Sequence, residues 1–348
     1  ERPDDPEVQY YYGWTILDRR GPYDAWLFLK ERGDLPEAPA HVRASWYALH
    51  AKAVGMLRDF ERADRWLQRA MDVGAELPWV LVTRSVVWSW EDRCEEALAA
   101  LDQALTAKPW FRPAVQRRAH LLTLLERDDE ALQFLQQAAG QIQCAALHWQ
   151  ISAIHFERDE YDLALESLER YWEMVPLSEP SVAEDFYSVR SFLAYLAGND
   201  DDALAWARRS RSEKDGIVVQ RLQDPARRNR PRITLPVGFT QQHYMTCVPA
   251  TLASISRFWS MPADHLQVAE EICYNGTSAL AERRWAEDHG WYVREFTVTE
   301  EAAERLIHAG IPFTLTTLEP GSGHMVAVIG HDGRRGSLII RDPNHRLR

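Results

Sequence analysis

The sequence predicts an all-α solenoid of repeated helix pairs, followed by a smaller α+β domain. Three observations support this fold class. An alanine recurs at a nearly constant interval through the first two thirds of the chain, apolar runs of strand length begin after residue 232, and a turn sequence separates the last two of these runs. With 348 residues, 46% of them hydrophobic, the chain is long enough for two cores, because domains usually contain about 100–200 residues.

The recurring alanine lies in related contexts at intervals of 34, 34, 33 and 39 residues, at Ala63, Ala97, Ala131, Ala164 and Ala203. A period of 34 residues is typical of the tetratricopeptide repeat, a helix-turn-helix unit. Twelve residues before each alanine the residue is also small: Ala51, Ser85, Ala119, Ser152 and Ser191. Small residues at both places let the two helices of a unit approach closely. We therefore expect a solenoid of about six tetratricopeptide-like units in residues 1–214, the first marked by Gly13 and Ala25.

Tetratricopeptide proteins, which this region resembles, place their concave, ligand-facing positions on the first helix of each unit. In this chain those positions form a largely aromatic set: Trp79, Val86, Trp90, His120, Trp149, Phe156 and Phe192. A groove with that much apolar surface needs a partner. We expect a peptide or protein to dock there, and two alternatives stay open: the side chains pack inside the solenoid, or the C-terminal domain covers them.

Residues 215–232 lose the helical period and gather five arginines, Arg221, Arg227, Arg228, Arg230 and Arg232. A basic run of this kind can contact nucleic acid or a membrane. The formal net charge of the whole chain is −12, however, and such a charge repels a phosphate backbone. We therefore expect a solvated basic linker and no nucleic-acid partner.

The cellular compartment is indicated by cysteine usage and by the absence of long apolar runs. No run approaches the ~18 apolar residues of a membrane span. The cysteines Cys94, Cys144, Cys247 and Cys273 lack paired spacing, which favours a reducing compartment. Arginine far outnumbers lysine, as is typical of GC-rich codon usage. We expect a cytoplasmic bacterial protein without a membrane span, and leave open a targeting segment or a further domain beyond either end.

The last domain, residues 233–348, begins with a short strand-like run, a loop from Gln241 to Cys247, and an apolar helix from Pro249. Proline suits the first turn of a helix, and Thr246 is a suitable N-cap. Cys247 then lies at or beside the helix N-terminus, where the unpaired amide groups and the helix dipole favour a thiolate over a thiol. We expect the other three cysteines to be buried and structural.

Three further apolar runs, 311–318, 324–330 and 337–342, predict buried strands. The turn between the last two contains Asp332-Gly333, which indicates a β-hairpin. If the hairpin folds about the centre of this turn, His324 pairs directly with Asp342, close enough for the carboxylate to accept a hydrogen bond from the imidazole. With Cys247, this pair supplies the nucleophile, base and orienting carboxylate that nucleophilic catalysis requires.

These motifs resemble the C39-like peptidases of the papain-like clan. The resemblance rests on Gln241-x5-Cys247-Val248-Pro249-Ala250, Gly323-His324-Met325-Val326 and Arg341-Asp342-Pro343, and covers residues 233–348. It implies a papain-like fold in which Cys247 is the nucleophile, His324 the general base and acid, Asp342 the orienting residue and Gln241 an oxyanion donor. The sequence departs from the family at Val248, where glycine is common, and a β-branched residue there could crowd the thiol.

The sequence therefore predicts a cysteine peptidase that cleaves a peptide or protein through an acyl-thioester on Cys247, with the solenoid recruiting substrate or partner. Two alternatives use the same residues: acyl transfer to an amine, and a catalytically weak pseudo-peptidase that scaffolds peptides. His243, His331 and His345 lie near the motifs and could nominally bind zinc with Cys247, but their spacing fits no usual ligand pattern. We expect no metal and no cofactor.

Overall fold

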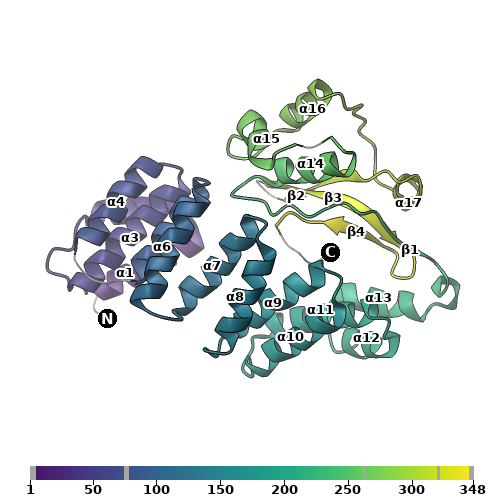
Figure 1. The fold of residues 1–348 in the computed structure, drawn as a ribbon, viewed down its shortest axis with the longest axis horizontal. Coiled ribbons are helices and arrows are strands. Elements are labelled where there is room, and N and C mark those ends of the chain that lie inside the picture. The colour runs from purple at the N-terminus through teal and green to yellow at the C-terminus, as the bar shows by residue number, and fades with distance from the viewer. Residues whose placement is uncertain (1–4, 74–77, 262, 320–321, 345–348) are drawn as a thin grey trace. The chain divides into compact units, whose positions relative to one another are not determined.

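The computed structural model of the protein describes residues 5–73, 78–261, 263–319 and 322–344 (Figure 1). The chain divides into two compact units, Glu1–Gln143 and Cys144–Arg348. This division falls earlier than the predicted end of the solenoid at residue 214. The reason is that the last helix pairs contact the C-terminal sheet through Tyr195 and Arg341.

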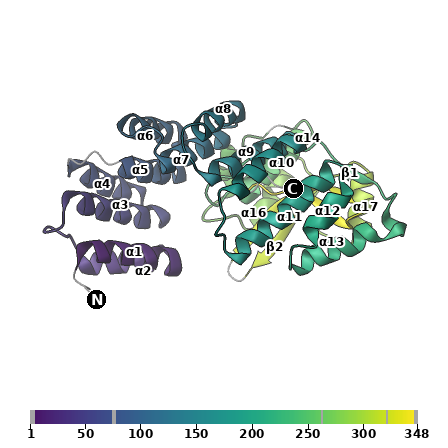
Figure 2. The same cartoon turned by 90° about the horizontal axis from the view of Figure 1, so that it is seen from below.

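The first unit consists of helix pairs joined by short turns, with α1 beside α2 and α3 beside α4 (Figure 2). The first helices of neighbouring pairs also contact each other, as α3 does with α5 and α5 with α7. The bounds of these helices are α1 Pro6–Arg20, α2 Pro22–Arg32, α3 Ala40–Met56, α4 Phe60–Asp72, α5 Pro78–Trp90, α6 Cys94–Ala107, α7 Arg112–Leu124 and α8 Asp128–Ala139.

The second unit begins with two more helix pairs and a further helix. Their bounds are α9 Ala145–Glu157, α10 Tyr161–Glu173, α11 Pro180–Leu196, α12 Asp200–Ala207 and α13 Glu213–Gln223, followed by the short 3-10 helix η1 Pro225–Arg227. In the described ranges, α1–α12 thus form six consecutive pairs. The prediction that the helical period ends at residue 215 is wrong, because α13 continues to Gln223.

The repeat alanines lie at the contact between the two helices of each pair. Each has an exposed fraction of 0%: Ala63, Ala97, Ala131, Ala164 and Ala203. In two pairs the small residue twelve positions earlier also makes a hydrogen bond across this contact. Ser152 Oγ donates to the carbonyl of Ala164 at 2.8 Å, and Ser191 Oγ donates to that of Ala203 at 2.7 Å. These contacts confirm the close helix approach that the repeat pattern predicts.

A residue with positive φ lies in the turn of five pairs, five positions before the repeat alanine. These residues are Arg58 (63°), Asp92 (61°), Glu126 (56°), Asp159 (58°) and Gly198 (81°). The amide of the next residue donates to the carbonyl five residues earlier, as from Asp59 to Val54 at 3.0 Å, which is a Schellman-type helix end. The turn is therefore periodic in backbone conformation even where it lacks glycine.

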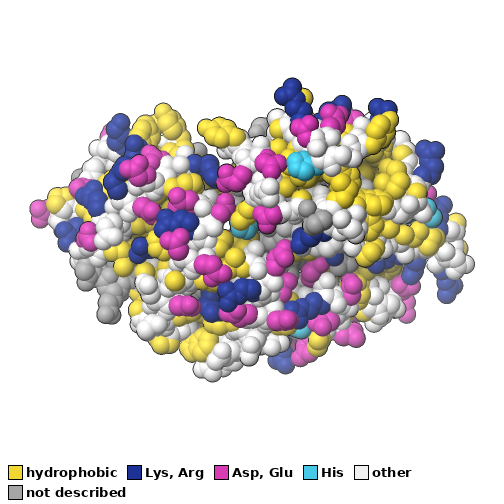
Figure 3. All heavy atoms as spheres, turned by 45° about the horizontal axis from the view of Figure 1, so that its top comes forward, with side chains coloured by type: hydrophobic (Ala, Val, Ile, Leu, Met, Phe, Trp, Pro, Cys, Tyr) yellow, Lys and Arg dark blue, Asp and Glu magenta, His cyan; other side chains and the backbone are white. Residues whose placement is uncertain are grey.

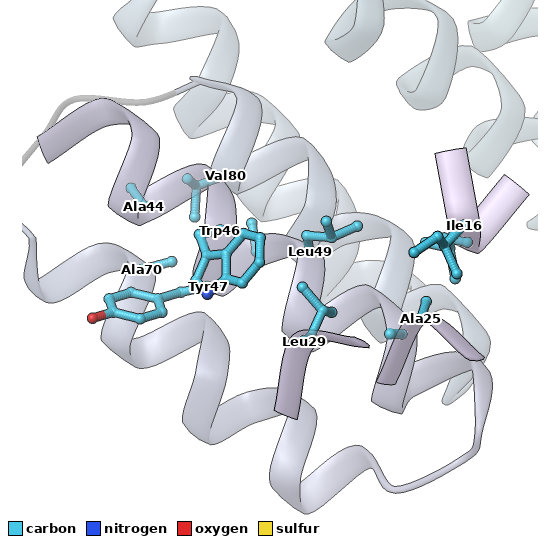
Figure 4. Packing of buried hydrophobic residues seen from close by; sticks show 12 residues of the cluster. Ile16, Ala25, Leu29, Ala44, Trp46, Tyr47, Leu49, Ala70 and Val80 are labelled. Carbon is cyan, nitrogen blue, oxygen red and sulfur yellow. The ribbon is translucent and has the colours of Figure 1, made fainter. Parts of the chain in front are cut away.

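The main core of the first unit lies between the helices α1 to α5 (Figure 4). Leu29 and Trp46 are completely buried there. A Cβ atom added at Gly13 would lie 3.0 Å from Leu49 Cδ2 and 3.3 Å from Phe28 Cε1. A side chain at this position would therefore collide with α2 and α3, so glycine permits the close approach of α1.

The C-terminal sheet is antiparallel, and β3 pairs with each of the other described strands. β1 pairs with the last residues of β3, β2 with its first residues, and β4 with residues 327–332. The strands are β1 Arg232–Thr234, β2 Phe313–Glu319, β3 Ser322–Asp332 and β4 Ser337–Arg341. The sequence predicted all four strands, with boundaries that differ by a few residues.

Helices cover both faces of this sheet (Figure 1). On one face, α14 packs Ile255 against Ala327 and Ile329. On the other, α17 packs Ala303 and Ile307 against Val328. The helices of this domain are α14 Cys247–Phe258, α15 His265–Ile272, α16 Ala279–Asp288 and α17 Glu300–His308. β3 is therefore enclosed, and its alternate side chains belong to two separate cores.

The turn between β3 and β4 is held by solenoid helices of the second unit. Tyr195 on α11 donates a hydrogen bond to Asp332 at 3.0 Å, and Arg334 pairs with Asp200 at 2.6 Å. Burial, and then the charge of Asp332, raise the pKa of Tyr195, so the phenol stays protonated. The Arg335 guanidinium lies 4.4 Å from the Phe192 ring centroid. This turn is part of the interior of the unit.

Three of the five arginines expected in a solvated linker also hold this turn. Arg221 Nη1 donates to the carbonyls of Arg335 and Gly336 at 2.9 and 2.6 Å, and Arg227 Nη1 donates to that of Gly333 at 3.1 Å. Arg232 lies 3.6 Å from Asp332. The expectation of a solvated linker is wrong for these three side chains, because backbone carbonyls and a buried carboxylate bind them.

The distribution of surface charge and the length and hydrophobicity of the helices bear on contacts with nucleic acid and with a membrane. On the face shown in Figure 3, basic and acidic side chains are interspersed. Proteins that bind a phosphate backbone usually gather basic side chains on one surface. Within the described ranges, no helix is both long and apolar enough to cross a bilayer.

His50 on α3 makes the stability of the first unit depend on pH. Its exposed fraction is 4%, and its ring stacks on Trp66 with centroids 4.1 Å apart. Burial lowers the pKa of His50 to about 4, while the nearby charge of Asp34 acts in the opposite direction. Between this value and about 6.5, the unfolded chain therefore binds a proton that the folded chain does not.

We expect the free energy of unfolding to fall as the pH decreases from about 6.5 to about 4, with a loss of about 3 kcal/mol caused by His50. His50→Phe keeps a flat ring against Trp66 and should remove this part of the loss in urea denaturation at a series of pH values. His41→Phe, at an exposed position of the same helix, is the control and should retain it. An unchanged slope in His50→Phe would show that another group is responsible.

Candidate active site

Cys247 is the first residue of α14, and its side chain is half-buried. Thr246 occupies the N-cap position but does not cap the helix. Its Oγ1 accepts a hydrogen bond from the amide of His243 at 2.9 Å and bonds to His265 Nε2 at 2.8 Å. The first amide groups of α14 therefore receive no oxygen from the cap, and the positive end of the helix dipole stays available to an anion.

The loop before Cys247 has an unusual backbone conformation. Met245 has a φ of 63°, which residues other than glycine rarely adopt and which is common at functional sites. Its carbonyl accepts a hydrogen bond from Cys273 Sγ at 3.3 Å. Cys94 and Cys144 are buried as expected, whereas Cys273 is half-exposed and supports this loop.

His324 and Asp342 form the central pair of the candidate site. His324 Nε2 lies 2.7 Å from Asp342 Oδ1, and the exposed fractions of the two side chains are 33% and 17%. Asp342 Oδ1 also accepts a hydrogen bond from the amide of Asn344 at 2.8 Å. An ionised carboxylate only accepts hydrogen bonds, so in the neutral imidazole the proton is on Nε2 and Nδ1 carries a lone pair.

The expected direct pairing of His324 with Asp342 in the hairpin is wrong. The observed register pairs Ala327 with Arg341 and Asp332 with Ser337, with a β-bulge between Val328 and Gly330. Asp342 therefore lies about two positions along the strands from the residue directly opposite His324. The pair still meets, because side chains alternate with a period of two and diagonal neighbours on one face are within reach.

The helix that carries Cys247 is attached to the strand that carries His324. Thr251 Oγ1 donates to the carbonyl of Met325 at 3.3 Å, and Met325 packs in the core cluster that Cys247 also contacts. In the described part of the chain, no hydrogen bond joins Cys247 Sγ to His324. His324 and Asp342 are thus hydrogen-bonded to each other, whereas Cys247 lies on α14, the helix attached to β3.

Gln241 lies beside the segment that follows Asp342. Its Nε2 donates to the carbonyls of Pro343 and Asn344 at 3.2 and 3.3 Å, and the amide of Gln242 donates to Pro343 at 2.8 Å. These bonds connect the loop before α14 to the end of β4. In this structure the amide that was predicted to stabilise an oxyanion is therefore bound to backbone.

Val248, the departure from the family pattern, has an exposed fraction of 7%. Its side chain packs with Leu252, Trp285 and Met325 in the core beside α14. It therefore occupies an interior position, and its effect on the approach to the thiol stays a prediction.

A buried ion pair connects the solenoid to the residue before Asp342. Arg341 Nη1 bonds to Glu157 Oε1 on α9, and the two side chains are only 11% and 12% exposed. Arg341 Nε also donates to the carbonyl of Val237 at 3.1 Å. Nothing in the sequence pattern indicated this pair, because 184 residues separate its members.

The solenoid residues predicted to line a peptide groove lie in both units. Trp79, Val86, Trp90 and His120 belong to the first, and Trp149, Phe156 and Phe192 belong to the second. Phe156 is 1% exposed and packs inside the unit, so its assignment to an open groove is wrong. The Phe192 ring packs against Arg335 of the C-terminal domain. This contact agrees with the alternative in which the C-terminal domain covers the groove residues. The other five are half-buried, and Trp149 lies 5.2 Å from the Tyr171 ring.

The histidines that were weighed as zinc ligands have different surroundings. The His243 ring lies 5.0 Å from that of His265, and His331 lies on β3 beside Glu304 of α17. His345 lies outside the described residues.

Comparison with known proteins places the C-terminal domain in a peptidase-like class. Residues 234–348 match the model described as "Peptidase_C39 like family". The chain thus combines a tetratricopeptide-like helical region with a C39-like domain. No match is found among proteins with curated functions.

Solved structures with related helical folds include PilF of Pseudomonas aeruginosa, at 15% identity over 60% of this chain and 91% of that chain, with a TM-score of 0.44. PilW, described as a type IV pilus biogenesis factor, is 13% identical over 59% and 92%, with a TM-score of 0.45. A tetratricopeptide repeat protein of Parabacteroides merdae is 14% identical over 76% and 96%, with a TM-score of 0.41.

We expect Glu157→Ala to lower the free energy of unfolding of the second unit by about 3–5 kcal/mol, because it leaves the Arg341 charge buried without its partner. Guanidinium denaturation measures this loss. Glu173→Ala is the control, since its 3.9 Å pair with Arg170 is 59% and 68% exposed, and it should change stability by less than about 1 kcal/mol. Equal effects of the two substitutions would contradict the role given to the buried pair.

Proposed function

We propose that the C-terminal domain is a cysteine peptidase that cleaves a peptide or protein substrate through an acyl-thioester on Cys247. The observation that carries this proposal is the 2.7 Å hydrogen bond between His324 Nε2 and Asp342 Oδ1. It fixes the imidazole tautomer whose Nδ1 can accept the thiol proton. The family match of residues 234–348 and the position of Cys247 at a helix N-terminus support the same chemistry.

In the first half of the proposed reaction, His324 Nδ1 takes the proton of the Cys247 thiol. The thiolate attacks the scissile carbonyl carbon, a carbon–sulfur bond forms, and an electron pair moves onto the carbonyl oxygen. When the oxyanion collapses, the carbon–nitrogen bond breaks and the imidazolium gives its proton to the leaving amine. Asp342 stabilises the imidazolium throughout and keeps the ring in one orientation.

In the second half, a water molecule attacks the thioester carbonyl while His324 accepts a proton from it. The carbon–sulfur bond then breaks, the imidazolium returns the proton to the Cys247 sulfur, and the product acid leaves. The amide of Cys247, at the start of α14, is one donor for the oxyanion in both halves. Gln241 is the second, and its amide has to exchange its bonds with the carbonyls of Pro343 and Asn344 for a bond with the oxyanion.

The proposed mechanism requires the imidazole and the thiol to come together when substrate binds. Catalytic hydrogen bonds are often long or poorly aligned without substrate and tighten in the complex. The His324 side chain is 33% exposed, which leaves room for a small rotation of the ring.

We assign recruitment of the substrate or a protein partner to the solenoid. Half-buried side chains at the ligand-facing positions of the first unit, Trp79, Val86, Trp90 and His120, support this part of the proposal. Phe156 and Phe192 are not included among the recruiting side chains. Phe156 is buried in the interior of the second unit, and Phe192 packs against Arg335.

A scaffold that binds peptides without cleaving them is the second candidate function. Two observations favour it. Among the described residues no hydrogen bond joins Cys247 Sγ to His324, and the side-chain amide of Gln241 already donates to the carbonyl of Pro343. Acyl transfer to an amine uses the same residues as hydrolysis, and peptide products formed with and without an added amine would separate these two reactions.

We expect Cys247 to be alkylated by iodoacetamide rapidly at neutral pH, because in the proposed mechanism His324 accepts the proton of its thiol. His324→Ala should slow this alkylation at least about tenfold at neutral pH, with a smaller difference in alkaline solution where free thiols also ionise. Mass spectrometry of the alkylated peptide gives the rate for each cysteine separately.

Cys273 is the matched internal control, since it is also half-exposed but bonds to the Met245 carbonyl. Its alkylation rate should be the same in both proteins. A Cys247 rate that matches that of Cys273, and that is unaffected by His324→Ala, would contradict the peptidase and favour the scaffold.

A further inference from the structure

A cluster of potential metal ligands lies between α17 and β3. Glu300 and Glu304 are four residues apart on α17, so they lie on the same face of the helix. His331 on β3 completes the group, and the ligand atoms of the three side chains all lie within 4.8 Å of one another. The sequence did not reveal the cluster, because only the packing of α17 on the sheet brings these residues together.

His331 is the buried member of the cluster, and its Nε2 atom lacks a hydrogen bond. Its exposed fraction is 4%, and its Nε2 makes no hydrogen bond although it lies 3.3 Å from Glu304 Oε1. Buried imidazole nitrogens are normally hydrogen-bonded or bound to metal, because leaving one without a partner is unfavourable. The nitrogen lies within 4.8 Å of carboxylate oxygens of Glu300 and Glu304, and a neutral imidazole there would be a ligand for a cation.

The two elements that carry the ligands are held rigidly. His331 pairs with Ile233 of β1 and with Leu338 of β4. Helix α17 packs on the same face through Ala303 and Ile307, which are 0% and 1% exposed. Ligands on packed secondary structure stay in place without the ion, which favours specific binding.

We propose that Glu300, Glu304 and His331 bind a divalent transition-metal ion, with Zn²⁺ as the ion that suits them best. One imidazole and two carboxylates are ligands of zinc, whereas calcium and magnesium prefer oxygen alone. Ligand atoms around a tetrahedral zinc ion lie roughly 3.4 Å apart. The 3.3 Å separation of His331 Nε2 and Glu304 Oε1 already matches this distance.

Glu300 is the exposed member of the cluster. It is exposed, so a rotation of its side chain can bring its carboxylate to the ion, and water can occupy the fourth position. The bound ion ties α17 to β3 and has a structural role. His331 and His324 are seven residues apart along β3, or roughly 20 Å of strand, so this ion would not take part in chemistry at Cys247.

The test is a calorimetric titration of the full chain with Zn²⁺ after removal of metal by a chelator. We expect the native protein to bind one more Zn²⁺ than the variant Glu300→Gln, Glu304→Gln. Glu300→Gln alone, at an exposed position that should not affect folding, should weaken the affinity at this site at least about tenfold. Glu301→Gln, the adjacent exposed carboxylate of the same helix, is the matched control and should bind like the native protein.

Thermal denaturation distinguishes a metal site from a plain ion pair between His331 and Glu304. For a metal site, Zn²⁺ raises the Tm of the native protein and of Glu301→Gln but not that of the double variant, because only the folded site binds the ion. The proposal is overturned if the native protein and the double variant bind the same number of ions, or if Zn²⁺ shifts their Tm values equally. Neither result depends on peptidase activity.

Discussion

The hydrogen-bonded pairing of β3 with every other described strand is the constraint on which the C-terminal domain depends. His324 lies near the start of this strand, and His331 and Asp332 lie at its end. The strand also passes between two helices, so that Val328 and Ile329 are completely buried in different cores. Any displacement of β3 would therefore change the candidate active site, the metal ligands and the contacts with the solenoid together.

The same hairpin explains why the last helix pairs and the C-terminal domain form one unit. At the tip of the hairpin, Asp332 accepts a hydrogen bond from the Tyr195 hydroxyl. At the end of β4, Arg341 pairs with Glu157. Asp342 is the next residue. The residue before the carboxylate that binds His324 is therefore held by an acid that belongs to a solenoid helix.

The sequence predicted those features that a local pattern determines. Close helix packing requires a small residue such as Ala97 at a fixed interval, and alternation along strands keeps His324 and Asp342 on one face even though the register differs by two positions. Features that depend on the tertiary fold were missed. The left-handed turn at Arg58 lacks the glycine that usually occupies this conformation, and no spacing rule connects Glu304 with His331.

The central claim is that Asp342 holds His324 in the tautomer whose Nδ1 is available to Cys247. The direct measurement is the pair of ¹⁵N chemical shifts of the His324 ring in the labelled full chain, assigned with His324→Gln. At a pH of about 8.5 an ordinary histidine is neutral. We predict a proton on Nε2 in the native protein and a mixture of tautomers in Asp342→Asn. A proton on Nδ1 in the native protein would contradict the account.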